Sequence, residues 1–108
     1  MPTAFFKAII SALILSNEPG FYKEGEYGIR LENLMLVKKF DEKFLCFETL
    51  TLVPFDLSLI DFKMLTYPEK KWLAEYHQNI LQVIGDALNY QELSWFMSNY
   101  CEPKILNF

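Results

Sequence analysis

The sequence has few histidines and cysteines: His77 is its only histidine, and Cys46 and Cys101 are its only cysteines. Two cysteines without a Cys-x-x-Cys pair exclude a disulfide framework, and free thiols are the usual state in a reducing compartment. Cys46 has no base near it in the sequence, so a nucleophilic role is not expected. His77 lies in a segment of helical pattern, where we expect an ordinary polar helix residue.

An excess of positive charge is also absent. The formal net charge is −4 and the isoelectric point is about 4.9, so nucleic acid is not an expected partner. The apolar stretch at residues 4–15 is shorter than the roughly 20 residues of a membrane-spanning helix. Lys7 lies inside this stretch and the polar residues Asn17 and Glu18 follow it, which is unlike a signal peptide. We therefore predict no membrane segment and a cytoplasmic protein.

Apolar and aromatic residues are abundant, at 52% and 17% of the chain. A domain of this size has a high surface-to-volume ratio and cannot bury so many of them. We expect part of this apolar surface to be covered by more polypeptide, by a second copy of the chain, or by both. A tightly packed small domain is the alternative.

Strand-like patterns fill the first half of the chain. The expected strand segments are residues 13–15, 27–39 and 44–53. The expected turns lie at Pro19-Gly20, near 24–25 and near 41–43. Residues 29–37 are apolar on both alternating faces, which predicts a strand that is covered on both sides. Short turns between such strands favour an antiparallel meander.

After Pro54 the pattern becomes helical. Thr66 and Glu69 have the spacing of a capping box, and apolar residues then recur at helical intervals. A second start signal lies at 89–92, and we expect Pro103 to end that helix. The predicted fold class is therefore α+β: an antiparallel strand meander followed by a helical hairpin. The aromatic residues at helical spacing, Trp72, Tyr76 and Trp95, are expected in a core or an interface.

Three charged residues in the strand region are the candidates for chemistry. Arg30 and Glu32 lie two residues apart and share a strand face, about 7 Å from one another. A hairpin closing around residues 20–27 would bring Glu18 close to Glu32. Two close carboxylates repel unless a cation lies between them, and oxygen ligands suit hard ions such as Mn²⁺ or Mg²⁺. On the residues alone, the alternative is that Glu18 is a turn acid and Glu32 pairs with Arg30.

Four segments of the chain resemble Xaa-Pro aminopeptidases, the metallopeptidases of the creatinase or pita-bread fold. They are, in order, residues 16–22 (SNEPGFY), 28–33 (GIRLEN), 47–54 (FETLTLVP) and 72–77 (WLAEYH). Their spacing also suits that family. The resemblance implies that residues 1–53 are the C-terminal part of a pita-bread catalytic domain and that residues 54–108 are the helical C-terminal extension of longer members.

The same resemblance implies a site with two metal ions, usually manganese, held by two Asp, one His and two Glu. Glu18 corresponds to the first Glu, which holds a metal and helps to move protons. Glu32 corresponds to the second Glu, which bridges both metals, and Arg30 to an arginine that supports the site. Such a site would activate a water molecule to attack the peptide bond before proline.

The chain departs from the family pattern in two ways. The two Asp and the His ligand lie upstream of these segments in full-length members, and His77 corresponds to the extension helix. The family usually has Gly-Met where this chain has Ala12-Leu13. We therefore expect a fragment that carries two of five metal ligands and is inactive alone.

Such a fragment would need the upstream part of the peptidase as its partner, and would act on peptides only when the site is completed. The alternatives are a non-catalytic interaction or dimerisation module that associates with itself, or a non-functional remnant of a split gene.

Overall fold

The computed structural model describes residues 12–100 and 105–107, and it divides into two compact units at Leu52 and Val53. Pro103, Cys101 and most of the apolar stretch at 4–15 lie outside the described residues. In the described part, no helix has both the length and the apolar character needed to cross a membrane. The assignment of the two halves to a catalytic part and a family extension remains a prediction.

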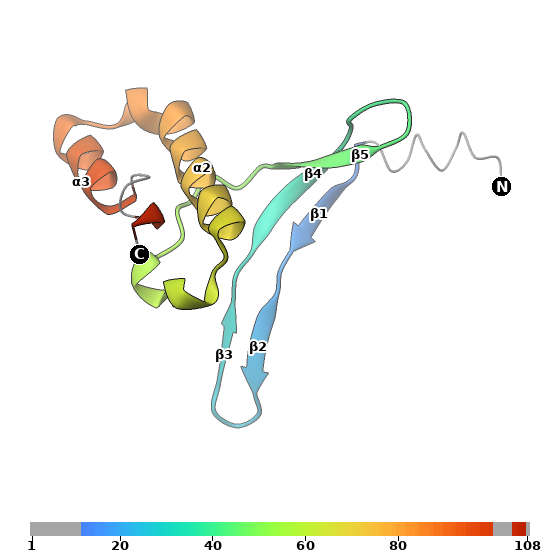
Figure 1. The fold of residues 1–108 in the computed structure, drawn as a ribbon, viewed down its shortest axis with the longest axis horizontal. Helices are drawn as coiled ribbons and strands as arrows, with labels where there is room; N and C mark the ends of the chain where they lie inside the picture. Colours follow the sequence, from blue (N-terminus) through green and yellow to red (C-terminus); the bar gives the residue numbers. More distant parts are fainter. Residues whose placement is uncertain (1–11, 101–104, 108) are drawn as a thin grey trace. The chain divides into compact units, whose positions relative to one another are not determined.

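The first unit is built of antiparallel strands (Figure 1). They are β1 (Ile14–Asn17), β2 (Gly20–Lys23), β3 (Tyr27–Arg30), β4 (Asn33–Lys39) and β5 (Leu45–Thr49). One sheet has the order β1-β4-β5, and β2 pairs with β3 in a second sheet. A hydrogen bond from the Leu31 N–H to the Pro19 carbonyl, 3.1 Å long, joins the chain segments between the two sheets. The strands and the helices of the second unit confirm the α+β class.

Two of the three predicted turns are present, and each has a local cause; at Pro19-Gly20 the chain makes no turn, and Gly20 is the first residue of β2. Between β2 and β3 the chain turns at Gly25, whose φ of 73° is in the left-handed region that glycine adopts without strain. Between β4 and β5, the Asp41 carboxylate accepts hydrogen bonds from the backbone N–H groups of Lys43 and Phe44, at 2.7 and 2.8 Å. Ala12 has a φ of 118° and stands where the resembled family usually has glycine.

Two expectations about the strands were wrong. The predicted strand at 27–39 is interrupted at Leu31 and Glu32, and every residue of β1, β2 and β3 is exposed. In β4 only Asn33 and Val37 are buried. The described residues of this unit form strands without a second layer packed on them, so apolar residues on both faces meet solvent. The apolar pattern therefore indicates strand faces that another layer could cover, although no such layer covers them in the described residues.

The second unit is helical and has its own core. Two 3₁₀ turns, Leu57–Leu59 and Phe62–Met64, lead into α2 (Tyr67–Ile84), a short 3₁₀ helix (Gly85–Ala87) and α3 (Tyr90–Tyr100). The core cluster comprises Leu57, Phe62, Leu73, Ala74 and Ile105. The capping box at Thr66 is confirmed, with Glu69 accepting a 2.7 Å hydrogen bond from the Thr66 N–H. Of the three aromatics, Tyr76 is buried, whereas Trp72 and Trp95 are half exposed.

His77 is not an ordinary polar helix residue: its side chain is fully buried. Its Nε2 atom accepts a hydrogen bond of 3.1 Å from the Phe55 N–H, and Nδ1 has no hydrogen-bond partner among residues 12–100 and 105–107. Tyr76, the preceding residue on α2, also binds the segment at 53–55, because its hydroxyl donates a hydrogen bond to the Val53 carbonyl at 2.8 Å. Burial lowers the pKa of His77 to about 4. The sequence pattern failed here because helical spacing does not show which face the 53–55 segment will cover.

The start of α3 gives a first testable prediction. The Asn89 Oδ1 accepts a hydrogen bond from the Glu92 N–H at 3.0 Å, and the Glu92 carboxylate accepts one from the Asn89 N–H at 2.9 Å. Asn89→Ala removes an N-cap acceptor and should lower the free energy of unfolding by about 1 kcal/mol. Chemical denaturation followed by tryptophan fluorescence measures this. Asn89→Ser keeps a capping oxygen and should retain most of the stability; an equal loss in both variants would contradict a capping role.

Candidate functional site

The chain segments between the two sheets carry the candidate residues. Glu18 follows directly after β1, Arg30 is the last residue of β3, and Glu32 directly precedes β4. Asn17 pairs with Asn33 in the β1–β4 register, and Gly20 pairs with Arg30 in the β2–β3 register. The two pairings lie on either side of the break between the two sheets, at residues 18–19 and 31–32. They place the three side chains close together at this break.

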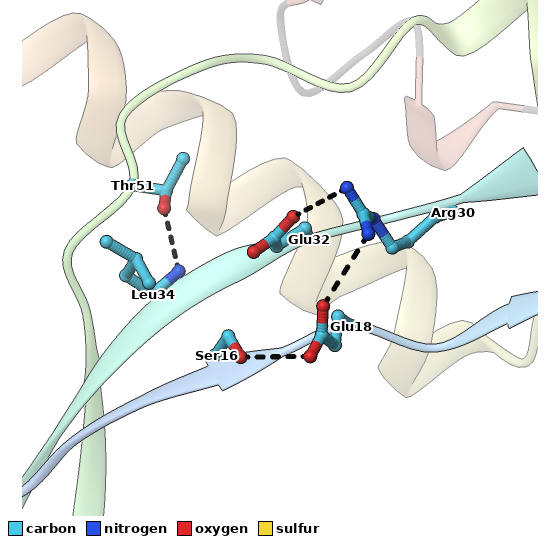
Figure 2. A network of polar contacts seen from close by, with 6 residues as sticks. All are labelled: Ser16, Glu18, Arg30, Glu32, Leu34 and Thr51. Carbon is cyan, nitrogen blue, oxygen red and sulfur yellow. Dashed lines mark hydrogen bonds and ion pairs between the residues drawn. The ribbon is translucent and has the colours of Figure 1, made fainter.

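Arg30 lies between the two carboxylates, as Figure 2 shows. Its Nη1 atom is 3.8 Å from Glu18 Oε2, and its Nη2 atom is 3.4 Å from Glu32 Oε2. The Ser16 hydroxyl donates a hydrogen bond of 3.2 Å to the other Glu18 oxygen, Oε1. The structure thus brings together all three residues predicted from the sequence. It also contains the Arg30–Glu32 pair that the residue-based alternative expected.

The three side chains are not buried, contrary to the expectation of a covered strand. The exposed fractions are 49% for Glu18, 54% for Arg30 and 40% for Glu32. Exposed ion pairs contribute at most about 1 kcal/mol, so this cluster is not explained by a large gain in stability. Two carboxylates and one guanidinium leave the cluster with one net negative charge. The carboxylate oxygens of Glu18 and Glu32 are therefore accessible from solvent and carry an uncompensated negative charge.

The fit of this cluster to a metal ion is partial. Carboxylate oxygens are the ligands that hard divalent ions prefer, and here two of them converge. Among the residues that the structure describes, no group of three or more His, Cys, Asp or Glu side chains is placed to hold a metal ion. The cluster therefore suits two positions in a larger ligand set, and a complete site needs further ligands.

Sequence reasoning missed two hydroxyl groups near this cluster. Ser16 could have been found, because it lies two residues before Glu18 and alternate residues of an extended chain share a face. Thr51 could not, because its hydroxyl accepts a hydrogen bond from the Leu34 N–H, 17 residues away, at 2.8 Å. That contact depends on how β5 ends, which no local pattern shows.

Comparison with known proteins identifies the family. The family model for the C-terminal region of peptidase M24 matches residues 43–103, which is more than half of the chain. A protein of Coprinopsis cinerea named "Probable Xaa-Pro aminopeptidase P" is 40% identical over 97 residues, covering 82% of this chain and 16% of its own length. One of the same name from Arthroderma benhamiae is 44% identical over 88 residues, covering 75% and 13%.

A solved structure agrees with these relatives. The X-prolyl aminopeptidase of Caenorhabditis elegans, described as a cytosolic enzyme with a di-nuclear active site, has a TM-score of 0.71 and 36% identity. The match covers 80% of this chain and 15% of that enzyme. The chain thus spans about one sixth or less of the relatives it matches. The resemblance seen in the four sequence segments is confirmed: the chain belongs to the Xaa-Pro aminopeptidases of the M24 peptidase family and corresponds to their C-terminal region.

Proposed function

We propose that this chain supplies Glu18 and Glu32 as two oxygen ligands of a di-nuclear metal site in an Xaa-Pro aminopeptidase, with Arg30 as the cation that supports them. The observation that carries the proposal is the convergence of both carboxylates on Arg30, at 3.8 and 3.4 Å. The remaining ligands, two Asp and one His, would come from polypeptide that corresponds to the unmatched part of the relatives. The chain alone would be inactive.

Each residue has a defined task in this proposal. Glu32 would share its carboxylate between two cations, and Glu18 would bind one cation and accept or return a proton during peptide cleavage. Arg30 would keep the two carboxylates near one another before and after metal binding. Manganese is the proposed metal, because the resemblance to Xaa-Pro aminopeptidases implies it; the oxygen ligands from this chain suit Mn²⁺ or Mg²⁺. When bound, the metal pair would supply Lewis-acid polarisation of the substrate carbonyl and lower the pKa of a water nucleophile.

The exposed apolar side chains of the first unit support the need for a partner. Phe21, Tyr22, Ile29, Phe44 and Phe47 are each more than half exposed. So many large apolar side chains exposed in one small unit indicate surface that a partner could cover. We assign it to the upstream part of the aminopeptidase rather than to a second copy, because the relatives are at least six times longer than the matched segment. A cytoplasmic location belongs to the same proposal, since the C. elegans enzyme is described as cytosolic.

The chain alone provides a direct test. With Mn²⁺ and an Xaa-Pro peptide we expect no turnover above background, because two carboxylates cannot hold two metal ions. Addition of a polypeptide that corresponds to the upstream part of the C. elegans enzyme should produce turnover. Release of the N-terminal residue, measured by chromatography, detects both results. Steady turnover by the chain alone would overturn the proposed division of ligands, and gel filtration would show whether the chain forms a dimer instead.

A further inference from the structure

A row of three residues crosses the first unit beside the candidate ligands: Ser16, Leu34 and Thr51. Ser16 on β1 pairs with Leu34 on β4 in the antiparallel register. On the other side of β4, the Leu34 N–H donates a 2.8 Å hydrogen bond to the Thr51 hydroxyl (Figure 2). The row thus carries a hydroxyl side chain at each end. Ser16, at one end, lies two residues before Glu18, and Leu34, in the middle, lies two residues after Glu32.

The Thr51 contact replaces a hydrogen bond that the sheet would otherwise make. Met35 pairs with Thr49, so the next pair along the ladder is Leu34 with Leu50. In an antiparallel sheet, a hydrogen-bonded pair exchanges two N–H···O bonds. Here the Leu50 N–H donates to the Leu34 carbonyl at 2.8 Å, but the Leu34 N–H donates to the Thr51 hydroxyl instead. A side chain therefore anchors the beginning of β4, two residues after Glu32.

The Ser16 contact acts on the other carboxylate. Ser16 Oγ donates to Glu18 Oε1 at 3.2 Å, while Arg30 Nη1 lies 3.8 Å from Glu18 Oε2. Each oxygen of the carboxylate therefore has its own contact, on different sides of the group. Such a pair of contacts restricts the rotation of the side chain about its terminal torsion. Arg30 alone, at that distance, would restrict it less.

We propose that Ser16 and Thr51 are positioning residues for the two candidate metal ligands. Ser16 sets the orientation of the Glu18 carboxylate, and Thr51 fixes the backbone at the start of β4 so that Glu32 enters the site at a set position. This inference rests on the proposed function of Glu18 and Glu32. A ligand set must be held within about 0.5 Å of its productive geometry, and loss of a residue that orients a metal ligand typically costs 10- to 100-fold in metal affinity.

The first experiment uses the chain alone and tests the Thr51 contact. In Thr51→Val the Leu34 N–H loses its acceptor, and its amide hydrogen exchange should accelerate about five- to tenfold. Thr51→Ser keeps the hydroxyl and should restore the slow exchange. Thr49→Val, at the last residue of β5 and also half buried, is the matched control and should leave the Leu34 rate unchanged. Equal exchange rates at Leu34 in wild type and Thr51→Val would overturn the anchoring role.

The second experiment measures the Mn²⁺ dissociation constant of the chain assembled with the upstream polypeptide, from the electron paramagnetic resonance signal of free Mn²⁺. Ser16→Ala and Thr51→Val should each weaken binding about 10- to 100-fold, with rescue by Ser16→Thr and Thr51→Ser. Ser94→Ala, an exposed serine on α3, is the control for Ser16→Ala. Unchanged affinity in both variants would overturn the positioning roles.

Glu32→Gln in the same assay separates the two proposals. If Glu32→Gln weakens binding but Ser16→Ala and Thr51→Val do not, the positioning roles fail and the ligand role stands. If Glu32→Gln leaves binding unchanged, the proposed function itself fails. If all three variants weaken binding and the conservative replacements rescue it, both proposals are supported.

Discussion

Glu32→Gln is expected to lower kcat/KM for an Xaa-Pro peptide by at least about 100-fold in the assembled enzyme. Loss of a residue that only orients a metal ligand costs about 10- to 100-fold, and loss of the ligand itself should cost at least as much as the upper end of that range. Gln has nearly the same size as Glu but carries no charge, and only one of its two terminal atoms is an oxygen. It could not share a carboxylate between two cations. In the structure, Glu32 Oε2 is 3.4 Å from Arg30, so the substitution also removes one of the two anions that balance the guanidinium.

Glu42→Gln is the matched control for this experiment. Glu42 lies in the turn between β4 and β5, pairs with Lys39 at 2.8 Å and is 91% exposed. Its replacement changes the net charge of the chain by the same amount and should leave kcat/KM unchanged. Unaltered activity in Glu32→Gln would exclude the ligand role. Equal losses in the two variants would point to charge or folding rather than to the site.

Acid is expected to destabilise the helical unit through His77, by up to about 3 kcal/mol between pH 6.5 and pH 4. The pKa of this histidine is lowered from 6.5 to about 4 because the side chain is buried. Above pH 6.5 the imidazole is neutral in both the folded and the unfolded chain, and its contribution to stability is complete. Between pH 6.5 and 4 the unfolded chain binds a proton that the folded chain does not. Stability therefore falls as the pH falls through this window.

Burial is the cause of the lowered pKa, and the contacts of the His77 ring show why the burial site suits the neutral imidazole. Nε2 accepts the Phe55 N–H at 3.1 Å, so the neutral imidazole carries its proton on Nδ1. A proton added to Nε2 would replace this acceptor by a second donor facing the Phe55 N–H. The ring is also packed between aromatic neighbours, with centroids 5.0 Å from Tyr100 and 5.6 Å from Tyr76. Neither neighbour offers a negative charge to the imidazolium.

Denaturation at pH 7, 5.5 and 4.5, followed by the fluorescence of Trp72 and Trp95, measures this dependence. His77→Gln is the informative variant, because a Gln side-chain oxygen can accept the Phe55 N–H and does not titrate. Its stability should be nearly constant across the window in which the wild type loses stability. Parallel curves for the two proteins would contradict the role of His77.

Two carboxylates, Asp56 and Glu69, add to the loss of stability only at the acid end of this window and below it. Hydrogen bonds from the side chain and backbone of Ser58 lower the pKa of Asp56, and those from the backbone and side chain of Thr66 lower the pKa of Glu69. Groups with lowered carboxyl pKa values contribute stability above their unfolded values of 3.8 and 4.5. That contribution is lost only as the pH falls further, through the folded pKa values. The loss caused by His77 comes first.

Local signals in the sequence were sufficient for the outline of the fold. The capping residues Thr66 and Asn89, the turn at Gly25 and the Asp41 turn act through contacts within a few positions of the chain, and the structure contains each of them. The ordered segments 16–22, 28–33, 47–54 and 72–77 were sufficient to indicate the family. The convergence of Glu18 and Glu32 was also foreseeable, because a hairpin that closes at Gly25 leaves few other arrangements.

Only the tertiary structure decided which residues are buried and which distant groups meet. It exposed the strands predicted to be covered, because burial depends on what packs against a surface and not on the apolar pattern of that surface. His77 is buried because the 53–55 segment packs against α2, where the Phe55 N–H donates to a side chain 22 residues further along the chain. The tertiary structure also brought Thr51 to Leu34, because the end of β5 is set by the ladder with β4. The sequence by itself determined the α+β outline of the fold, the family and the pair of candidate carboxylates. The long-range contacts determined how those carboxylates are held.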